Sequence, residues 1–148
     1  NGIIKMELTV DYIGGVAFRA KARNHEILCD QPPAFGGQDT AMTPAELLLA
    51  SLGTCAGFFA IHYLKTRNLP HEGVSIKVSA EKTAERPFRL DNFTISVTVP
   101  GLEDERHREN VLRAVNACLV HQTLEHPPKV EIQLASGDVK SLAEAGGR

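Results

Sequence analysis

The 148-residue sequence has no tryptophan, few aromatic side chains and only three cysteines, Cys29, Cys55 and Cys118. A small, odd number of cysteines is unlike the disulfide framework of a small secreted protein. No two of them have the Cys-x-x-Cys spacing typical of a zinc ribbon. The sequence therefore predicts no metal and no cofactor, and it leaves each cysteine as a buried small side chain, a redox group or a nucleophile.

An excess of charge of one sign is also missing, since the formal net charge is −2. Without a basic footprint, nucleic acid is not an expected partner. The first residues lack the basic and then apolar order of a secretory signal, so we expect a cytoplasmic protein. The length fits a single domain over residues 1–148, with a loose tail from about residue 137.

The N-terminal part reads as three strands. Met6–Tyr12 is rich in strand formers, Gly14-Gly15 is a hairpin signal, and Val16–Ala22 alternates in polarity. His25–Cys29 predicts a third short strand. The following segment, Asp30–Thr43, contains two prolines and two adjacent glycines and is expected to be a loop.

A long helix is expected from about residue 44 to about residue 68. Thr43 suits the N-cap, Pro44 suits the first helical position, and Glu46 completes a capping box. From Leu47 to Leu64 the sequence contains no Asp, Glu, Lys or Arg. Such a helix either spans a membrane or is buried, and its polar residues within a sheet-rich chain favour burial without a membrane.

One sheet covers only one face of a helix, so a second copy of the chain is the simplest cover for the other face. Gly53 and Gly57 are four residues apart, which predicts a face suited to close helix contact. These features favour an obligate homodimer. The alternative is a monomer in which the remaining elements of the chain wrap both sides of the helix.

The second half alternates between strands and helix. Val74–Ser79 and Phe93–Val99 have the period of two that is typical of strands. Acidic residues from Glu103 open a second helix, whose apolar positions from Val111 to Leu119 include Cys118. Val130–Leu134 predicts a last strand. The expected order is β-β-β-α-β-β-α-β, an α+β fold.

Three segments resemble the OsmC/Ohr superfamily, and its OsmC-like branch in particular. Thr43–Cys55 is similar to the active-site helix of the family, in which a proline and an acid precede an apolar stretch and a cysteine. Cys118–Leu124, with the sequence CLVHQTL, is similar to the second-cysteine motif, although Leu119 stands where many relatives have proline. His25–Gly37 matches the same branch.

The resemblance implies an intertwined dimer with two sheets around central helices. It also implies a thiol peroxidase in which Cys55 attacks the peroxide and Cys118 resolves the product. Organic hydroperoxides would be the substrates, and a thiol or dithiol the reductant. The chemistry agrees, because a sulfenic acid condenses with a second nearby thiol to form a disulfide.

The resemblance further implies an acid paired with an arginine that steadies the thiolate. Ala45 directly follows the proline here, and Glu46 comes one position later. Glu46 is thus either this acid or a helix cap. Arg19 is the nearest arginine after the first hairpin, and it is either this arginine or a solvated strand residue.

Two other functions stay open. The chain could be a non-enzymatic module of the same fold that binds an apolar ligand in the dimer groove. It could also be a cysteine hydrolase that pairs Cys55 with His62 or His121, although no orienting carboxylate is evident for either histidine. Cys29 has no place in these mechanisms and is predicted to be structural.

Overall fold

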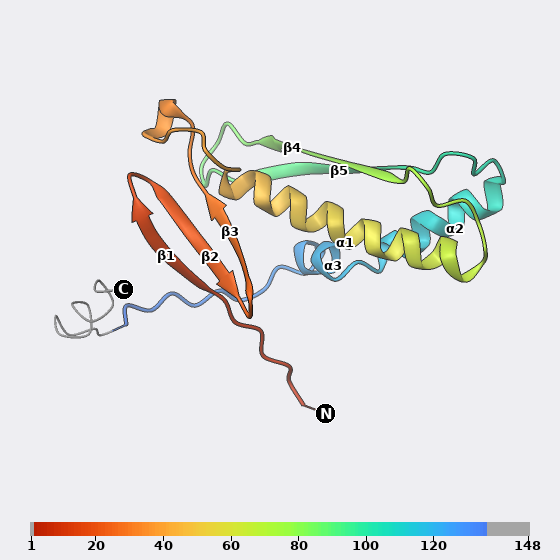
Figure 1. Cartoon of the computed structure of the whole chain (residues 1–148), viewed down its shortest axis with the longest axis horizontal. Coiled ribbons are helices and arrows are strands. Elements are labelled where there is room, and N and C mark those ends of the chain that lie inside the picture. Colours follow the sequence, from red (N-terminus) through yellow and green to blue (C-terminus); the bar gives the residue numbers. More distant parts are fainter. Residues whose placement is uncertain (1, 136–148) are drawn as a thin grey trace.

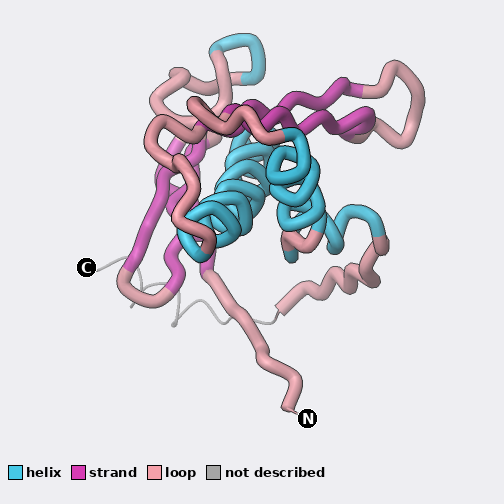
Figure 2. The backbone as a smooth tube through the Cα atoms, turned by 90° about the vertical axis from the view of Figure 1, so that its right-hand side faces the viewer, coloured by secondary structure: helices cyan, strands magenta, loops and turns pink. Residues whose placement is uncertain are grey.

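The computed structural model describes residues 2–135, so the tail expected from about residue 137 lies outside the described residues. Figure 1 shows a three-stranded sheet on one side and a long helix under a second, two-stranded sheet. Figure 2 shows the helices grouped between these two sheets. The α+β prediction is therefore confirmed.

The first sheet is antiparallel, with the order β1 (Thr9–Gly14), β2 (Ala17–Ala22) and β3 (His25–Cys29). Gly14 and Gly15 both have positive φ, as a tight hairpin requires. The first strand was expected from Met6 but begins at Thr9, which lies opposite Lys21 near the end of β2. The residues before Thr9 have no partner strand there, so they form no ladder.

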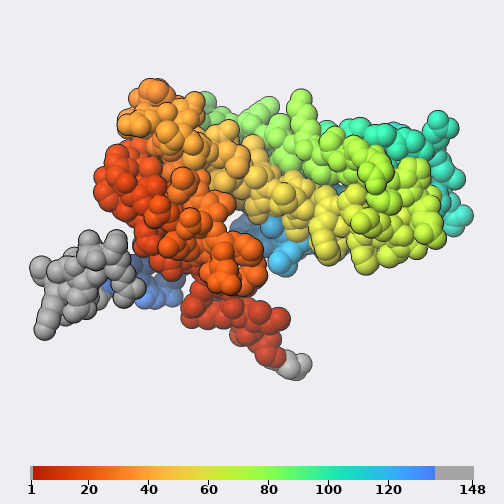
Figure 3. All heavy atoms as spheres, viewed as in Figure 1, coloured from red at the N-terminus to blue at the C-terminus, as the bar shows by residue number. Residues whose placement is uncertain are grey.

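The register gives this sheet two different faces. One face is apolar, and the other carries Asp11, Arg19, Lys21 and Glu26. The apolar face combines Val10, Tyr12, Phe18, Ala20, Ile27 and Cys29. Its large side chains are exposed to solvent, and the sheet makes few contacts with the rest of the chain. Figure 3 shows these strands, in red and orange, as a block beside the yellow and green body.

The long helix, α1 (Pro44–Thr66), begins at the predicted capping box. Thr43 Oγ1 accepts from the backbone of Glu46, and the Glu46 side chain accepts from the backbone of Thr43. The helix ends two residues before the expected point because Asn68 adopts positive φ. The N–H groups of Asn68 and Leu69 then bond to the carbonyls of Lys65 and Leu64, a pattern that terminates helices.

Two strands, β4 (Ser75–Lys82) and β5 (Leu90–Thr98), form the second sheet as an antiparallel pair. The predicted alternation is confirmed, since the apolar residues of both strands are half-buried and the polar ones are exposed. The half-buried face packs on α1, where Ala56, Ala60 and Leu64 are fully buried in the core.

The glycines of α1 face this sheet. A Cβ added to Gly53 would lie 3.0 Å from Val78 Cγ2, and one added to Gly57 would lie 3.5 Å from Ile76 Cγ1. The expectation that these glycines serve close contact with a second helix is therefore wrong. They let the helix approach the side chains of its own β4.

The second predicted helix is in fact two, α2 (Glu105–Asn116) and α3 (Leu119–Glu125). The chain turns at Cys118, which has an extended ψ and is the N-cap of α3. The Gln122 side chain donates to the Asn116 carbonyl at 2.7 Å, which satisfies a helix end that the turn exposes. Apolar spacing alone does not show this turn, because the buried stripe continues through it.

The predicted last strand is not formed. Residues 127–135 have no regular secondary structure, and Val130, Ile132 and Leu134 are almost completely exposed. The alternating pattern is present, but this segment pairs with no described strand, although both sheets have free edges.

By length and composition α1 is apolar enough to cross a membrane. The core helix of a soluble protein meets the same criteria. Here α1 contacts β4, β5, α2 and α3, yet only 28% of its most apolar stretch is buried. A single chain therefore leaves much of this helix uncovered.

Candidate active site

The structure brings Cys55 and Cys118 together. Cys55 lies on α1 and is half-buried, whereas Cys118 is fully buried at the start of α3. The Cys55 side chain lies close enough to Cys118 to raise the pKa of its thiol, and both residues are free thiols. Residues that are 63 positions apart in the sequence (118 − 55 = 63) thus meet where α1 contacts α3.

The surroundings of Cys118 disfavour the ionised form of its thiol. Burial is the main cause that raises the pKa of the Cys118 thiol, and the side chain of Cys55 raises it further. The backbone N–H of His121 donates to Cys118 Sγ at 3.5 Å, which acts in the opposite direction. Cys118 therefore keeps its proton at rest.

A histidine and a carboxylate follow Cys118 on α3. His121 Nε2 lies 3.1 Å from Glu125 Oε1, one helical turn later. Glu125 is thus a carboxylate partner of His121 that the sequence alone did not reveal. The i, i+4 spacing of the two residues was the only sequence signal that could have suggested it. His62, by contrast, is exposed and stacks on Phe58.

Glu46 and Arg19 are not joined in the described chain. The Glu46 carboxylate belongs to the helix cap, since Thr43 N–H and the Thr43 hydroxyl both donate to Glu46 Oε1, at 3.0 and 2.9 Å. These bonds, the backbone one first, lower the pKa of the Glu46 carboxyl. Arg19 Nε lies 3.8 Å from Glu26 Oε2 on the polar face of the first sheet.

A cavity of about 560 Å³ is lined by residues close in sequence to the two cysteines, although neither cysteine lines it. It is bounded by α1, β5, α2 and α3, and it includes Leu52, Val115 and His121, each three residues from one of the cysteines. Its wall combines seven apolar side chains with five polar ones, and the carboxylates among them are Asp91 and Glu125. This volume is in the range of small-molecule sites.

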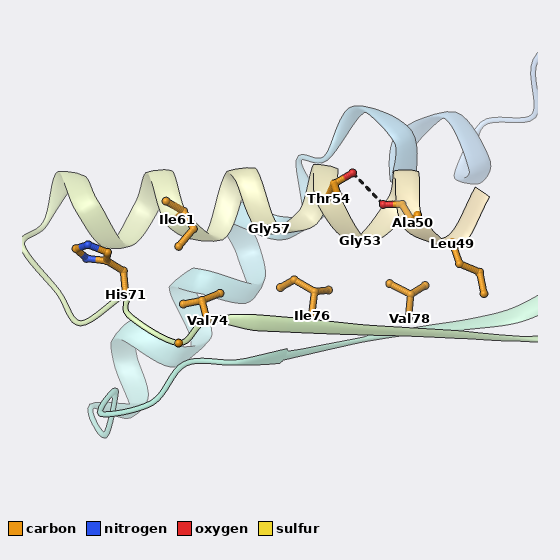
Figure 4. Close-up of a pocket in the computed structure, with 11 residues that line it drawn as sticks. Leu49, Ala50, Gly53, Thr54, Gly57, Ile61, His71, Val74, Ile76 and Val78 are labelled. Carbon is orange, nitrogen blue, oxygen red and sulfur yellow. Dashed lines mark hydrogen bonds between the residues drawn. The ribbon is translucent and has the colours of Figure 1, made fainter. Parts of the chain in front are cut away.

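A second cavity of similar volume lies between α1 and β4. Figure 4 shows the helix residues Leu49 to Ile61 above the row Val74, Ile76 and Val78, with His71 at one end. Within residues 2–135, no cluster of three or more His, Cys, Asp or Glu side chains could hold a metal ion.

Asp30 is a residue of this region to which the sequence analysis assigned no role. Its buried carboxylate accepts from Gln38 N–H, Thr40 N–H and Thr40 Oγ1 at 2.8–3.1 Å. Hydrogen bonds, with that from the Gln31 backbone largest, lower the pKa of Asp30 to about 2. The acid thereby organises the loop that leads into α1. In the sequence, the available signal for such a role was a single acidic residue shortly before Pro32 and Pro33.

Asp30→Asn is expected to destabilise the protein in a pH-dependent way. Because the folded pKa is below the usual value of 3.8, the carboxylate contributes its full stability above about pH 4 and loses it as the pH falls toward 2. Urea unfolding at about pH 5.5 and about pH 3 measures this, and the gap between wild type and variant should narrow at the lower pH. An equal difference in unfolding free energy between wild type and variant at both pH values would contradict this role of the Asp30 carboxylate.

The comparisons with known proteins agree on the fold. A family model described as OsmC-like protein matches residues 37–133. An OsmC-like protein from Mycoplasma pneumoniae has a TM-score of 0.72 at 16% identity, with 84% of this chain and 89% of that chain covered. No curated protein matches the sequence.

Two solved structures carry names that include an activity. An organic hydroperoxide resistance protein OsmC from Legionella pneumophila has a TM-score of 0.63 at 20% identity, covering 84% of this chain and 91% of that chain. An organic hydroperoxide resistance protein from Elizabethkingia anophelis has a TM-score of 0.61 at 20% identity, covering 82% and 89%. At these identities the likeness establishes the shared fold.

Proposed function

Because the chain belongs to the OsmC-like protein family, we propose that it reduces organic hydroperoxides with Cys55 as the attacking sulfur and Cys118 as the resolving one. The observation that carries the proposal is that the Cys55 side chain lies close enough to the buried Cys118 thiol to affect its pKa. Two relatives of the same fold are named organic hydroperoxide resistance proteins, which supports this substrate class.

The reaction needs two sulfur atoms with different roles. The Cys55 thiolate attacks the terminal peroxide oxygen, an S–O bond forms, the O–O bond breaks, and the alkoxide leaves as an alcohol after taking a proton. The Cys118 thiolate then attacks the Cys55 sulfur, a disulfide forms, and hydroxide leaves and is protonated to water. An external dithiol restores both thiols by exchange.

The asymmetry between the sulfurs supports this assignment of roles. Cys118 is fully buried and its pKa is raised, so it is a poor first nucleophile. Cys55 is half-buried and therefore the more accessible of the two. The apolar wall of the neighbouring cavity suits an alkyl chain on the peroxide.

Mapping disulfides after one equivalent of cumene hydroperoxide tests the proposal. We expect stoichiometric loss of the peroxide and a single Cys55–Cys118 bond, found by mass spectrometry of the digested protein. Cys29 should stay reduced, because it lies on β3 opposite Phe18 rather than beside the other two. Unchanged peroxide and three free thiols would instead favour a ligand-binding module without enzymatic activity.

The proposed active form is a homodimer. By the scaling for folded monomers, a chain of 16.1 kDa exposes about 7,400 Å². This chain exposes 12,099 Å². Full exposure of the residues outside the described range would add only about 2,200 Å². The exposed area that is left over, beyond that of a folded monomer and this allowance, is within the area that obligate homodimers bury.

The location of the uncovered surfaces also supports a second copy. The apolar face of β1–β3, the outer face of α1 around Phe58, and the alternating segment Val130–Leu134 are all exposed. A partner strand would complete the ladder for that segment, and a partner chain would cover the other two. Three free thiols suit a reducing compartment such as the cytoplasm.

A further inference from the structure

His121 occupies a special position relative to Cys118. Cys118 is the N-cap of α3, and His121 is the third helical residue, whose backbone N–H donates to Cys118 Sγ. In a capping box the side chain at this third position reaches back to the N–H of the N-cap. Here the Cys118 N–H already donates to the Val115 carbonyl at 3.0 Å. The His121 ring therefore lies on the same helical turn as the Cys118 thiol and does not accept a hydrogen bond from the Cys118 N–H.

The contact with Glu125 determines which ring nitrogen of His121 is free. An ionised carboxylate only accepts, so Nε2, 3.1 Å from Glu125 Oε1, carries the proton. The lone pair of the neutral ring is then on Nδ1. Nδ1 is buried and has no hydrogen-bond partner among residues 2–135. A buried lone pair with a fixed tautomer suits a general base. At rest Nδ1 makes no hydrogen bond to Cys118 Sγ, so that contact forms only as the side chains adjust for the resolving step.

The resolving step requires a base near Cys118. Cys118 is buried and protonated at rest, whereas only its thiolate attacks a sulfenic acid. Bulk water does not reach this sulfur, since the residue is fully buried. We propose that His121, oriented by Glu125, accepts the proton of Cys118 when the disulfide forms. This inference rests on the peroxidase function proposed above.

The step balances without any further reagent. The Cys118 S–H proton passes to His121 Nδ1, and the thiolate attacks Cys55 Sγ of the sulfenic acid. The S–S bond forms as the S–O bond breaks, and the leaving hydroxide takes the proton back from the imidazolium to become water. His121 ends the step neutral, so it is ready for the next turnover.

The surroundings favour a transient positive charge on the ring. Glu125 on α3 contacts it directly, and Asp91 on β5 lines the same cavity. The part of α2 that lines this side of the cavity contributes neutral residues, among them Val115 and Asn116, and α1 contributes Leu52 there and Cys55 nearby. Two acids and no cation line the described cavity, so an imidazolium is stabilised there.

His121→Gln separates the two half-reactions. Sulfenic acid formation, followed by dimedone trapping in rapid-quench samples, should stay within about twofold of wild type. Disulfide formation should slow by about 100-fold, the usual worth of a positioned base, so that sulfenic acid accumulates. His126→Gln is the matched control, since this exposed ring on the same helix bonds only to the Gln122 carbonyl.

Glu125→Gln is a second test that does not disturb the core, because this carboxylate is exposed. It should slow disulfide formation less than the histidine variant and should change the pH profile of that step only. Equal slowing of both half-reactions in His121→Gln, or normal disulfide formation, would overturn the role of His121. A wild-type protein that consumes no peroxide would instead refute the proposed function itself.

Discussion

Cys55→Ser is expected to lower hydroperoxide consumption by on the order of 1,000-fold or more, the scale of losing a nucleophile. A serine hydroxyl does not accept the peroxide oxygen, and the remaining buried thiol, Cys118, is poorly placed for the first attack. Cys118→Ser should behave differently. It should consume one equivalent and stop, with Cys55 held as a sulfenic acid that dimedone labels.

The comparison of these variants with Cys29→Ser provides the control, because Cys29 lies on the first sheet away from the thiol pair. That variant should turn over at the wild-type rate in a coupled assay with a dithiol reductant. If Cys55→Ser and Cys118→Ser both retained repeated turnover, neither sulfur would have the proposed role. If Cys118→Ser alone remained fully active, an external thiol would resolve the sulfenic acid.

Phe58→Glu is expected to raise the dimer dissociation constant by on the order of 100-fold or more, because it buries an unpaired carboxylate in the proposed interface. Phe58 is 66% exposed in the single chain, midway along a helix that has no charged residue from Leu47 to Leu64. A two-fold interface repeats the change on both subunits, which adds to the effect.

Sedimentation equilibrium at several protein concentrations measures this change. Ser96→Glu is the matched control, since it adds the same charge to the exposed polar face of β5. It should leave the dissociation constant within about twofold of wild type, as surface changes away from special features usually do. A wild-type chain that sediments as a monomer at all concentrations would rule out the dimer, and equal effects of both variants would exclude Phe58 from the interface.

The sequence predicted the elements whose signals are local. The capping box at Thr43 and Glu46 involves groups three residues apart, and the alternation of β4 and β5 repeats every two residues. Elements that depend on distant partners were harder to predict. Residues Val130–Leu134 have the strand pattern, but a strand also needs a free edge elsewhere, and a sequence pattern does not say which chain supplies it.

The sequence also did not show which element the glycine face of α1 packs against. Gly53 and Gly57 mark a close approach, but two glycines four residues apart suit a sheet as well as another helix. The break at Cys118 was missed because the buried stripe runs across it. At the site, the two cysteines were identified by resemblance and do meet, whereas the Glu125 partner of His121 emerged only from the geometry of α3.

The bare apolar face of β1–β3 has a consequence for how the protein is made. These strands leave the ribosome before α1 exists, and no described residue of their own chain later covers that face. If the proposed dimer forms, newly made strands expose this apolar surface until a second chain covers it. The yield of native protein would then depend on the concentration of the chain and on chaperones that bind such surfaces.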